Sequence, residues 1–315
     1  MEKTHPDSFF RNRRFGFGLL AGLVVFALYI GWWYSIALHA ERYFRTWQAG
    51  LPAQGASASA RISLGGFPFA VVLHAHDFVY EKPNLLKISS PDLMVRLRPW
   101  TPYRPTAMAN DPTTFEFQKA GYNVKVDHFE ISFVKPWIGP YGSHDTGLVI
   151  NAHFYSTLLD ERRSIALGNT VNEASFTAKV KGFPPDIFST AALTAWRDGG
   201  SNIEFPWLKM VWGPLKCDGS GTLALDKALQ PQAAFEGRVA GYDKAIDALR
   251  DGGQIKPLVA SFFKAALKLL ENHKKSHEEE PTVPLPITIQ NNALSVAGVV
   301  LARWEPFPWP EKSAD

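Results

Sequence analysis

One apolar stretch near the N-terminus constrains this chain more than any other feature. Residues 15–38 read FGFGLLAGLVVFALYIGWWYSIAL, which is 24 residues without a charge. A helix rises about 1.5 Å per residue, so this stretch covers about 36 Å and can cross a hydrocarbon core about 30 Å thick. We therefore predict one transmembrane helix. Its membrane-spanning residues include Phe15, Leu20, Val25, Ile30 and Leu38.

The flanks of this helix predict its processing and its orientation. A cleaved signal peptide has an apolar run of about 7–15 residues and then a small-x-small cleavage site. Here the run is longer, and Leu38 stands where cleavage after Ala40 needs a small residue, so we predict an uncleaved anchor. The basic N-terminal flank places residues 1–14 in the cytoplasm. The predicted interface anchors are Arg13, Arg14, Trp32, Trp33 and Tyr34.

The remainder of the chain is then expected beyond the membrane. After the anchor the sequence contains no second apolar run of about 18 residues. We expect the helix to continue to about residue 49, a linker over 50–60, one domain over 61–308 and a tail over 309–315. In a bacterium this arrangement is a single-pass inner-membrane protein with a periplasmic domain.

Sequence periodicity predicts that this domain is mainly β. Apolar and polar residues alternate in many short runs, such as YNVKV (122–126) and FTAKV (176–180), which Gly, Pro, Asn or Asp separate. We expect a large, curved antiparallel sheet, with helices over 185–197, 243–250 and 257–275 at its side or end. The longest helix has an apolar stripe that we expect to close the apolar mouth of the sheet. That stripe consists of Leu258, Phe262, Ala266, Leu269 and Leu270.

Composition excludes several classes of function. The net charge is only +3, so the chain lacks the strongly basic character typical of nucleic-acid binding. Cys217 is the only cysteine, which excludes an internal disulfide and a zinc site built on two or more cysteines of this chain.

One histidine pair has the spacing of metal ligands on a strand. His74 and His76 form H-x-H, so both side chains point to one face, and Asp77 or His153 could complete a zinc site with them. No further ligand pair has a recognisable spacing, however. We therefore predict ordinary polar strand positions, with neither a metal nor another cofactor.

Two loops bear on catalysis and partner binding. Ser143, His144 and Asp145 are consecutive, and consecutive side chains leave the backbone in different directions, which does not suit a catalytic triad. The chain also lacks a G-x-S-x-G elbow, so we predict that the protein is not an enzyme. The aromatic and basic segment 100–105 (WTPYRP) is interpreted as a connection between strands in preference to a partner-binding loop.

The glycine-rich segment 211–226 reads VWGPLKCDGSGTLALD. It does not match the G-x(4)-G-K-[ST] pattern of a phosphate loop, and Lys216 is the only basic neighbour that could favour a Cys217 thiolate. Asp218-Gly219 followed by Gly221 instead predicts the tight turn of a β-hairpin.

Four segments together carry a resemblance to a known family. They are SLGGFPFAVVL (63–73), VRLRPWTPYRP (95–105), WGPLKCDGSGTLALD (212–226) and PLPITIQNNALSVAGVVLARWEPFP (284–308). Over about residues 20–308 the chain resembles an uncharacterised family of Gram-negative membrane-anchored periplasmic proteins, a domain of unknown function. The segments nearest the C-terminus are also similar to AsmA-like envelope proteins. This similarity implies an elongated β-sheet groove and a role in outer-membrane lipid homeostasis. Neither resemblance supplies catalytic residues.

Two functional hypotheses follow. The apolar side of the predicted strands can either fill a closed core or line an open groove that takes acyl chains, and the anchor and the resemblance favour the groove. The first hypothesis is a non-enzymatic protein of cell-envelope maintenance that binds or transfers membrane lipids. The alternative is a membrane-tethered scaffold that binds envelope proteins and no lipid.

Overall fold

The computed structural model describes residues 7–119, 121–136, 139, 142–160, 165–185, 189–270, 282–307 and 309. Parts of the predicted cytoplasmic tail, of the helix predicted over 257–275 and of the C-terminal tail therefore lie outside the described residues. The side chains of Arg13, Arg14 and Phe15 lie outside them as well.

A single long helix, α1 (Asp7–Gly50), forms the N-terminal part of the described chain. Within α1, Leu19–Gly50 is long and apolar enough to cross a membrane. Leu20, Val25 and Leu28 each expose more than half of their surface, which suits side chains that face lipid. By length and composition α1 is a candidate membrane span, and its end lies one residue beyond the predicted end.

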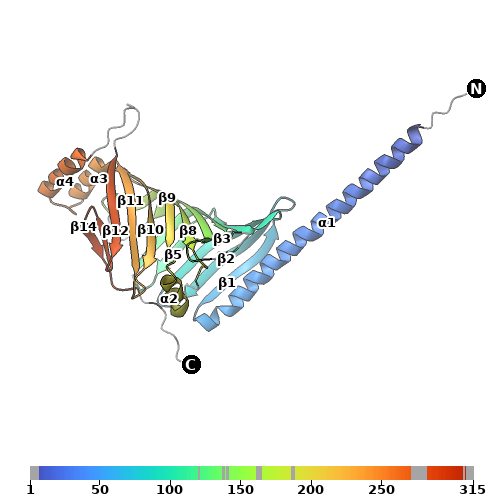
Figure 1. Cartoon of the computed structure of the whole chain (residues 1–315), viewed down its shortest axis with the longest axis horizontal. Helices are drawn as coiled ribbons and strands as arrows, with labels where there is room; N and C mark the ends of the chain where they lie inside the picture. The colour runs from blue at the N-terminus through green and yellow to red at the C-terminus, as the bar shows by residue number, and fades with distance from the viewer. Residues whose placement is uncertain are drawn as a thin grey trace, which may run out of the picture.

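Fourteen strands of the described chain form one sheet, in which the pairings are antiparallel. Thirteen of them follow one path in chain order, and β5 lies off this path and pairs with β3 and β6. The sheet twists from β1, which lies beside α1, to β12 and β14 near α3 and α4 (Figure 1). The prediction of a mainly β domain with a large antiparallel sheet is confirmed.

The strands are β1 (Ser57–Gly65), β2 (Val71–Lys82), β3 (Leu86–Arg98), β4 (Thr101–Ala109), β5 (Thr113–Phe117), β6 (Tyr122–Val134), β7 (Thr146–Leu158), β8 (Thr170–Lys181), β9 (Ile203–Trp212), β10 (Leu215–Leu225), β11 (Pro231–Ala240), β12 (Val283–Gln290), β13 (Ala293–Val296) and β14 (Val299–Arg303). The shorter helices are the 3-10 turn η1 (Pro52–Gln54), α2 (Thr190–Asp198), α3 (Tyr242–Asp251) and α4 (Pro257–Leu269).

The two faces of the sheet differ in chemistry, because directly paired residues lie on the same face. One row of paired positions crosses eleven strands and contains only apolar residues and glycine. It runs Leu64, Leu73, Val95, Ala107, Ile131, Ala152, Phe176, Leu208, Gly219, Gly237 and Leu285. The adjacent row, on the opposite face, is mostly polar. It runs Ser63, His74, Met94, Met108, Glu130, His153, Ser175, Lys209, Asp218 and Arg238.

Helices cover the two ends of the apolar face. At one end α1 packs on β1 and β2, where Ala40 and Phe44 meet the cluster around Leu73. At the other end α3 and α4 pack on β10 to β12 around Val239 and Val283. The buried residues form separate clusters along the sheet. Helices cover the clusters at the two ends, whereas the cluster of Ala109, Val126 and Phe129 on β4 and β6 packs against strand residues.

The predicted hairpin turn at Asp218-Gly219 is wrong. Leu215–Leu225 is one continuous strand, and the turn lies earlier, at Gly213-Pro214. The glycines inside the strand are required by close neighbours. A Cβ on Gly219 would lie 2.5 Å from the carbonyl oxygen of Glu236, and one on Gly221 would lie 2.3 Å from Cδ1 of Phe235.

Three other boundaries differ from the predictions. The linker is shorter than 50–60, because β1 begins at Ser57 and pairs with β2 from there. Only Trp100 of segment 100–105 lies in a connection, since β4 begins at Thr101 and pairs with β3 despite its prolines. The first domain helix begins at Thr190, because the Ser189 hydroxyl accepts from the Ala192 N–H and caps it.

The orientation predicted for the apolar stripe of α4 is also wrong. Leu258, Phe262 and Leu269 are 83%, 71% and 88% exposed. The α4 residues that pack toward α3 and the sheet include Ala260 and Phe263, on a different side of the helix. Helix α4 thus has two apolar sides, and periodicity alone does not distinguish the inner one from the outer one.

Candidate functional site

The middle of the apolar face carries a ladder of phenylalanine rings. Neighbouring ring centroids lie 5.6–6.4 Å apart, within the usual range for aromatic pairs. The ladder runs Phe129, Phe154, Phe176, Phe205 and Phe235, from β6 to β11. All but Phe129 are only partly buried. The middle of the face therefore carries a partly covered aromatic surface, which is buried at the end where Phe129 lies.

The ladder crosses β10 at a glycine. Gly221 pairs with Phe205 of β9 and with Phe235 of β11, so its missing side chain leaves the space in which the two rings meet. Their centroids lie 5.6 Å apart. The glycine therefore keeps the aromatic surface continuous across β10.

A pocket of about 960 Å³ lies at the α1 end of the sheet. Helix α1 lines one side from Trp32 to Trp47, and the strands line the other with Leu73, Val95 and Leu97. A volume of this size lies within the usual range of ligand sites, which are mostly apolar with a few polar groups. Polar groups of this pocket include those of His39 and Arg42.

Two strand connections dock onto α1 beside this pocket. The Trp33 indole N–H donates to the Ala70 carbonyl oxygen at 2.8 Å, and the Trp32 indole N–H donates to that of Pro99 at 3.1 Å. The Phe67 ring lies 5.5 Å from the Trp33 ring, edge to face.

These contacts give one predicted interface anchor a further role. Trp33 is only 5% exposed and docks the domain onto α1, and its place at the membrane interface stays a prediction. Trp32 and Tyr34 both remain more than half exposed.

The lone cysteine faces the apolar side. Cys217 pairs with Met210 and Val239 and packs against the cluster beneath α3 and α4. Burial, followed by the charge of Asp218, raises the pKa of the Cys217 thiol to about 11. The thiol is therefore protonated near neutral pH and acts as a packing residue.

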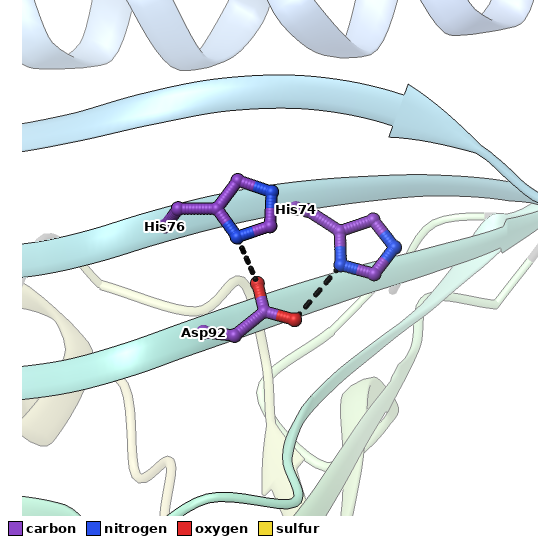
Figure 2. A group of neighbouring side chains, drawn as sticks. All are labelled: His74, His76 and Asp92. Atoms are coloured by element: carbon purple, nitrogen blue, oxygen red, sulfur yellow. Dashed lines mark hydrogen bonds and ion pairs between the residues drawn. The ribbon is translucent and has the colours of Figure 1, made fainter.

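The other candidates from the sequence lie apart from this face. The Asp145 carboxylate accepts a hydrogen bond from the Gly142 N–H at 3.0 Å, as a turn residue does. Asp77 pairs with Arg61, and the His153 ring lies beside that of Trp207. The acidic partner of His74 and His76 is a residue that the sequence does not single out, Asp92 of β3 (Figure 2).

Sequence reasoning missed both the ring ladder and Asp92. Each depends on the register between strands that are separated along the chain, and spacing in the sequence does not encode that register. The alternation within each strand was the available signal, and it identifies the apolar side of a strand but not its neighbours.

Comparison with known proteins places the chain in a family. The model of a family described as an uncharacterized protein conserved in bacteria, DUF2125, matches residues 33–134 and 148–305. The chain belongs to this family. Within the chain, the DUF2125 match begins at Trp33, where α1 docks onto the domain, and ends beyond β14. The resemblance to an uncharacterised bacterial family is thereby confirmed, and the similarity to AsmA-like envelope proteins stays a prediction. No curated protein and no solved structure matches the chain.

Proposed function

We propose that this protein is a non-enzymatic, membrane-anchored lipid-binding protein of the bacterial cell envelope, with its sheet in the periplasm. Acyl chains of membrane lipids bind along the apolar face, and the pocket beside α1 receives them from the membrane. The observation that carries this proposal is the apolar row from Leu64 to Leu285, which crosses eleven strands beside a partly exposed ring ladder.

The depth of α1 in a bilayer supports entry from the membrane. A helix needs at least about 20 residues to cross a hydrocarbon core of about 30 Å, so a span that starts after Arg14 ends between Tyr34 and the predicted end, Leu38. The docked connections contact Trp32 and Trp33, which lie at this end of the span.

Exposed aromatic side chains lie on the same connections. Phe69 and Trp100 are 75% and 59% exposed, next to Ala70 and Pro99, which accept hydrogen bonds from α1. Aromatic rings favour the interface between headgroups and acyl chains. In this arrangement the two rings reach into the outer leaflet beside α1.

The pocket begins at the depth where the membrane span ends. Its lining starts at Trp32 and continues along α1 to Trp47, away from the bilayer. Leu73 and Val95 of that lining belong to the apolar row of the sheet. A lipid that leaves the outer leaflet here keeps its acyl chain in apolar contact, whereas each methylene exposed to water would cost about 0.8 kcal/mol.

A polar group at the pocket suits a lipid headgroup. Arg42 lines the pocket and is exposed, and in the described part of the chain it forms no ion pair, whereas Arg45 is held by Glu41. A guanidinium binds phosphate oxygens through two parallel hydrogen bonds. We assign Arg42 to the phosphate of the bound lipid.

Lipid analysis of the purified full-length protein tests this function. The protein is extracted in a mild detergent, and bound lipid is measured by mass spectrometry. Leu208→Asp places a charge in the middle of the apolar row and is expected to reduce the bound phospholipid severalfold. Thr222→Asp is the matched control, because Thr222 is exposed and lies on the polar face of the neighbouring strand β10.

The outcomes separate clearly. Severalfold less phospholipid in Leu208→Asp than in the unaltered protein and in Thr222→Asp supports the proposal. Wild-type protein free of phospholipid, or equal lipid in all three proteins, contradicts it. Circular dichroism and the unfolding midpoint of each variant show whether the sheet is intact.

One observation favours a second function, a scaffold for envelope proteins. The outer side of α4 exposes Leu258, Phe262 and Leu269, and apolar surface of this kind often marks a protein interface. This function predicts a stable protein complex, detected by crosslinking in cells, that Phe262→Ser abolishes while bound lipid stays absent or unchanged.

A further inference from the structure

A group of potential metal ligands lies on the polar face, away from the proposed lipid surface. His74 and His76 of β2 and Asp92 of β3 each direct one ligand atom toward the others, and these atoms lie within 4.8 Å of one another. His74 Nδ1 is 2.9 Å from Asp92 Oδ2, and His76 Nδ1 is 3.3 Å from Asp92 Oδ1 (Figure 2).

Strand register produces this group. His76 pairs directly with Asp92 across β2 and β3, and His74 lies two residues along β2 on the same face. The two imidazole rings stack with centroids 5.5 Å apart and planes 11° from parallel. Both Nδ1 atoms therefore face the same carboxylate.

The spacing suits a tetrahedral ion. Bonds of about 2.0–2.1 Å to zinc at a tetrahedral angle place neighbouring ligand atoms about 3.3 Å apart. The two distances from Asp92 to the imidazoles, 2.9 and 3.3 Å, are close to this separation. All three ligand atoms lie within 4.8 Å of one another, not far above the separation that a tetrahedral ion requires.

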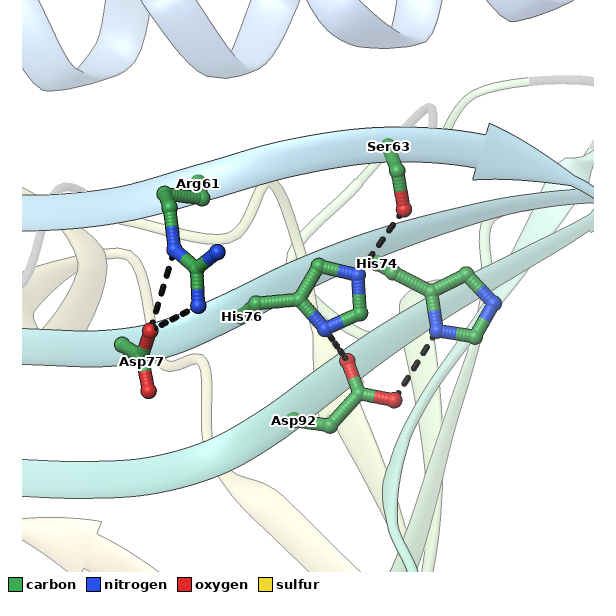
Figure 3. A network of polar contacts seen from close by, with 6 residues as sticks. All are labelled: Arg61, Ser63, His74, His76, Asp77 and Asp92. Carbon is green, nitrogen blue, oxygen red and sulfur yellow. Dashed lines mark hydrogen bonds and ion pairs between the residues drawn. The ribbon is translucent and has the colours of Figure 1, made fainter.

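The surroundings orient one ligand and leave another unsatisfied. His76 Nε2 lies 2.9 Å from the Ser63 hydroxyl oxygen, which can accept the Nε2–H and so leave the Nδ1 lone pair for a metal (Figure 3). Asp92 Oδ1 is buried, and among the described residues it accepts no hydrogen bond of good geometry. A buried polar atom in that state calls for a partner, and a bound cation is one.

A guanidinium beside the group is bound to a different carboxylate. Arg61 pairs with His76 in the β1–β2 register, but its side chain is bound to Asp77 through two nitrogens (Figure 3). Asp92 is thus available to the two imidazoles. Its side chain and those of the histidines are 22–39% exposed, so an ion can enter and water can complete its coordination.

We propose that His74, His76 and Asp92 form a zinc-binding site that joins β2 to β3 on the polar face of the sheet. Two imidazoles select zinc over calcium and magnesium, which prefer oxygen ligands. Three protein ligands leave one position for water. This inference does not depend on lipid binding, because the site and the apolar row lie on opposite faces.

Zinc titration of the full-length protein tests the site. The protein carries a tag without histidine, is purified in detergent, is stripped with a chelator and is titrated with zinc chloride against a chromogenic zinc indicator. We expect one zinc ion per chain. His76→Ala and Asp92→Asn are expected to abolish saturable binding, and Ser63→Ala to weaken it by about 10–100-fold, as losses of outer partners do.

His153→Ala is the matched control, because His153 lies on the same face outside the group and should leave zinc binding unchanged. Cobalt(II) gives a second readout, since its visible spectrum reports nitrogen ligands and coordination number without reference to activity. Absence of saturable zinc binding by the wild-type protein overturns the proposal. So does binding that His76→Ala and Asp92→Asn leave unchanged, or that His153→Ala removes to the same extent.

Discussion

The rings of Phe205 and Phe235 lie 5.6 Å apart although their strands, β9 and β11, are not neighbours. Strand β10 lies between them, and Gly221 is its residue at the crossing point. Because a Cβ at Gly221 would lie 2.3 Å from Cδ1 of Phe235, the ring contact requires glycine at this position. The aromatic surface of the sheet thus depends on a residue that contributes no side chain.

Replacement of Gly221 should therefore disturb both stability and the apolar surface. Gly221→Val forces the Phe235 ring out of its place, and overpacking of this kind costs about 1–3 kcal/mol. Ser220→Val, one residue earlier and exposed on the polar face, should change stability by less than about 0.5 kcal/mol. Denaturant unfolding of the two variants in detergent measures the difference. Equal unfolding free energies would show that the glycine is not required.

Removal of the Trp33 ring should detach the domain from α1. Trp33 is buried, and its indole N–H donates a hydrogen bond to the Ala70 carbonyl oxygen. Trp33→Ala should therefore destabilise the docked state, relative to the undocked one, by about 3–5 kcal/mol. A cysteine at Ala37, which is 1% exposed in the same cluster, reports undocking through its maleimide labelling rate in a Cys217→Ser background. Tyr34→Ala is the control, since Tyr34 is exposed. Equal labelling rates in the two variants would exclude a docking role for Trp33.

The Cys217 thiol should be unreactive below strongly alkaline pH. Its folded pKa of about 11 exceeds the ordinary value of 9.0, so folding favours the protonated thiol. The stability that this thiol contributes is complete below pH 9 and is lost as the pH rises through about 11.

Iodoacetamide labelling at pH 8 checks this state of the thiol. Native Cys217 should react at least about tenfold more slowly than an exposed cysteine, because only the thiolate attacks. The comparison protein carries Cys217→Ser together with Ser220→Cys, which moves the thiol to the polar face of the same strand. Equal labelling rates of the two proteins would show that the Cys217 thiol is exposed to solvent and contradict this prediction.

The connections that dock onto α1 should lie in the outer leaflet. A spin label at Phe69→Cys, in a Cys217→Ser background, is expected to be accessible to oxygen dissolved in the bilayer and protected from a water-soluble nickel complex. Asn84→Cys lies at the opposite end of strand β2 and should show the reverse accessibility. The same accessibility at both labels would mean that the sheet does not rest on the membrane at Phe69.

The sequence predicted the parts of this molecule that short-range chemistry determines. The long apolar stretch required a helix, and alternation in runs such as 122–126 and 176–180 required strands with one apolar side. The hairpin predicted at Asp218-Gly219 failed because the same glycines serve close packing between strands, and local turn preference cannot distinguish the two uses.

The candidate sites lay beyond such reasoning. The ring ladder needs Phe176, Phe205 and Phe235 to meet across strands, and the zinc group needs His76 to pair with Asp92 of the next strand. The register between neighbouring strands determines both of these contacts. The prediction that the apolar stripe of α4 faces the sheet failed for a related reason. Periodicity identifies an apolar stripe on a helix but not the element that packs against it.

Photocrosslinking at two adjacent residues tests the central claim most directly. Leu208 lies in the apolar row and Lys209 in the polar row, so the two side chains point to opposite faces of the same strand. A photoreactive phenylalanine analogue is placed at one position or the other in cells, and the crosslinked protein is analysed by mass spectrometry. We predict phospholipid adducts at position 208 and none at position 209. Absence of lipid adducts at 208, or equal adducts at both positions, would contradict lipid binding on the apolar face.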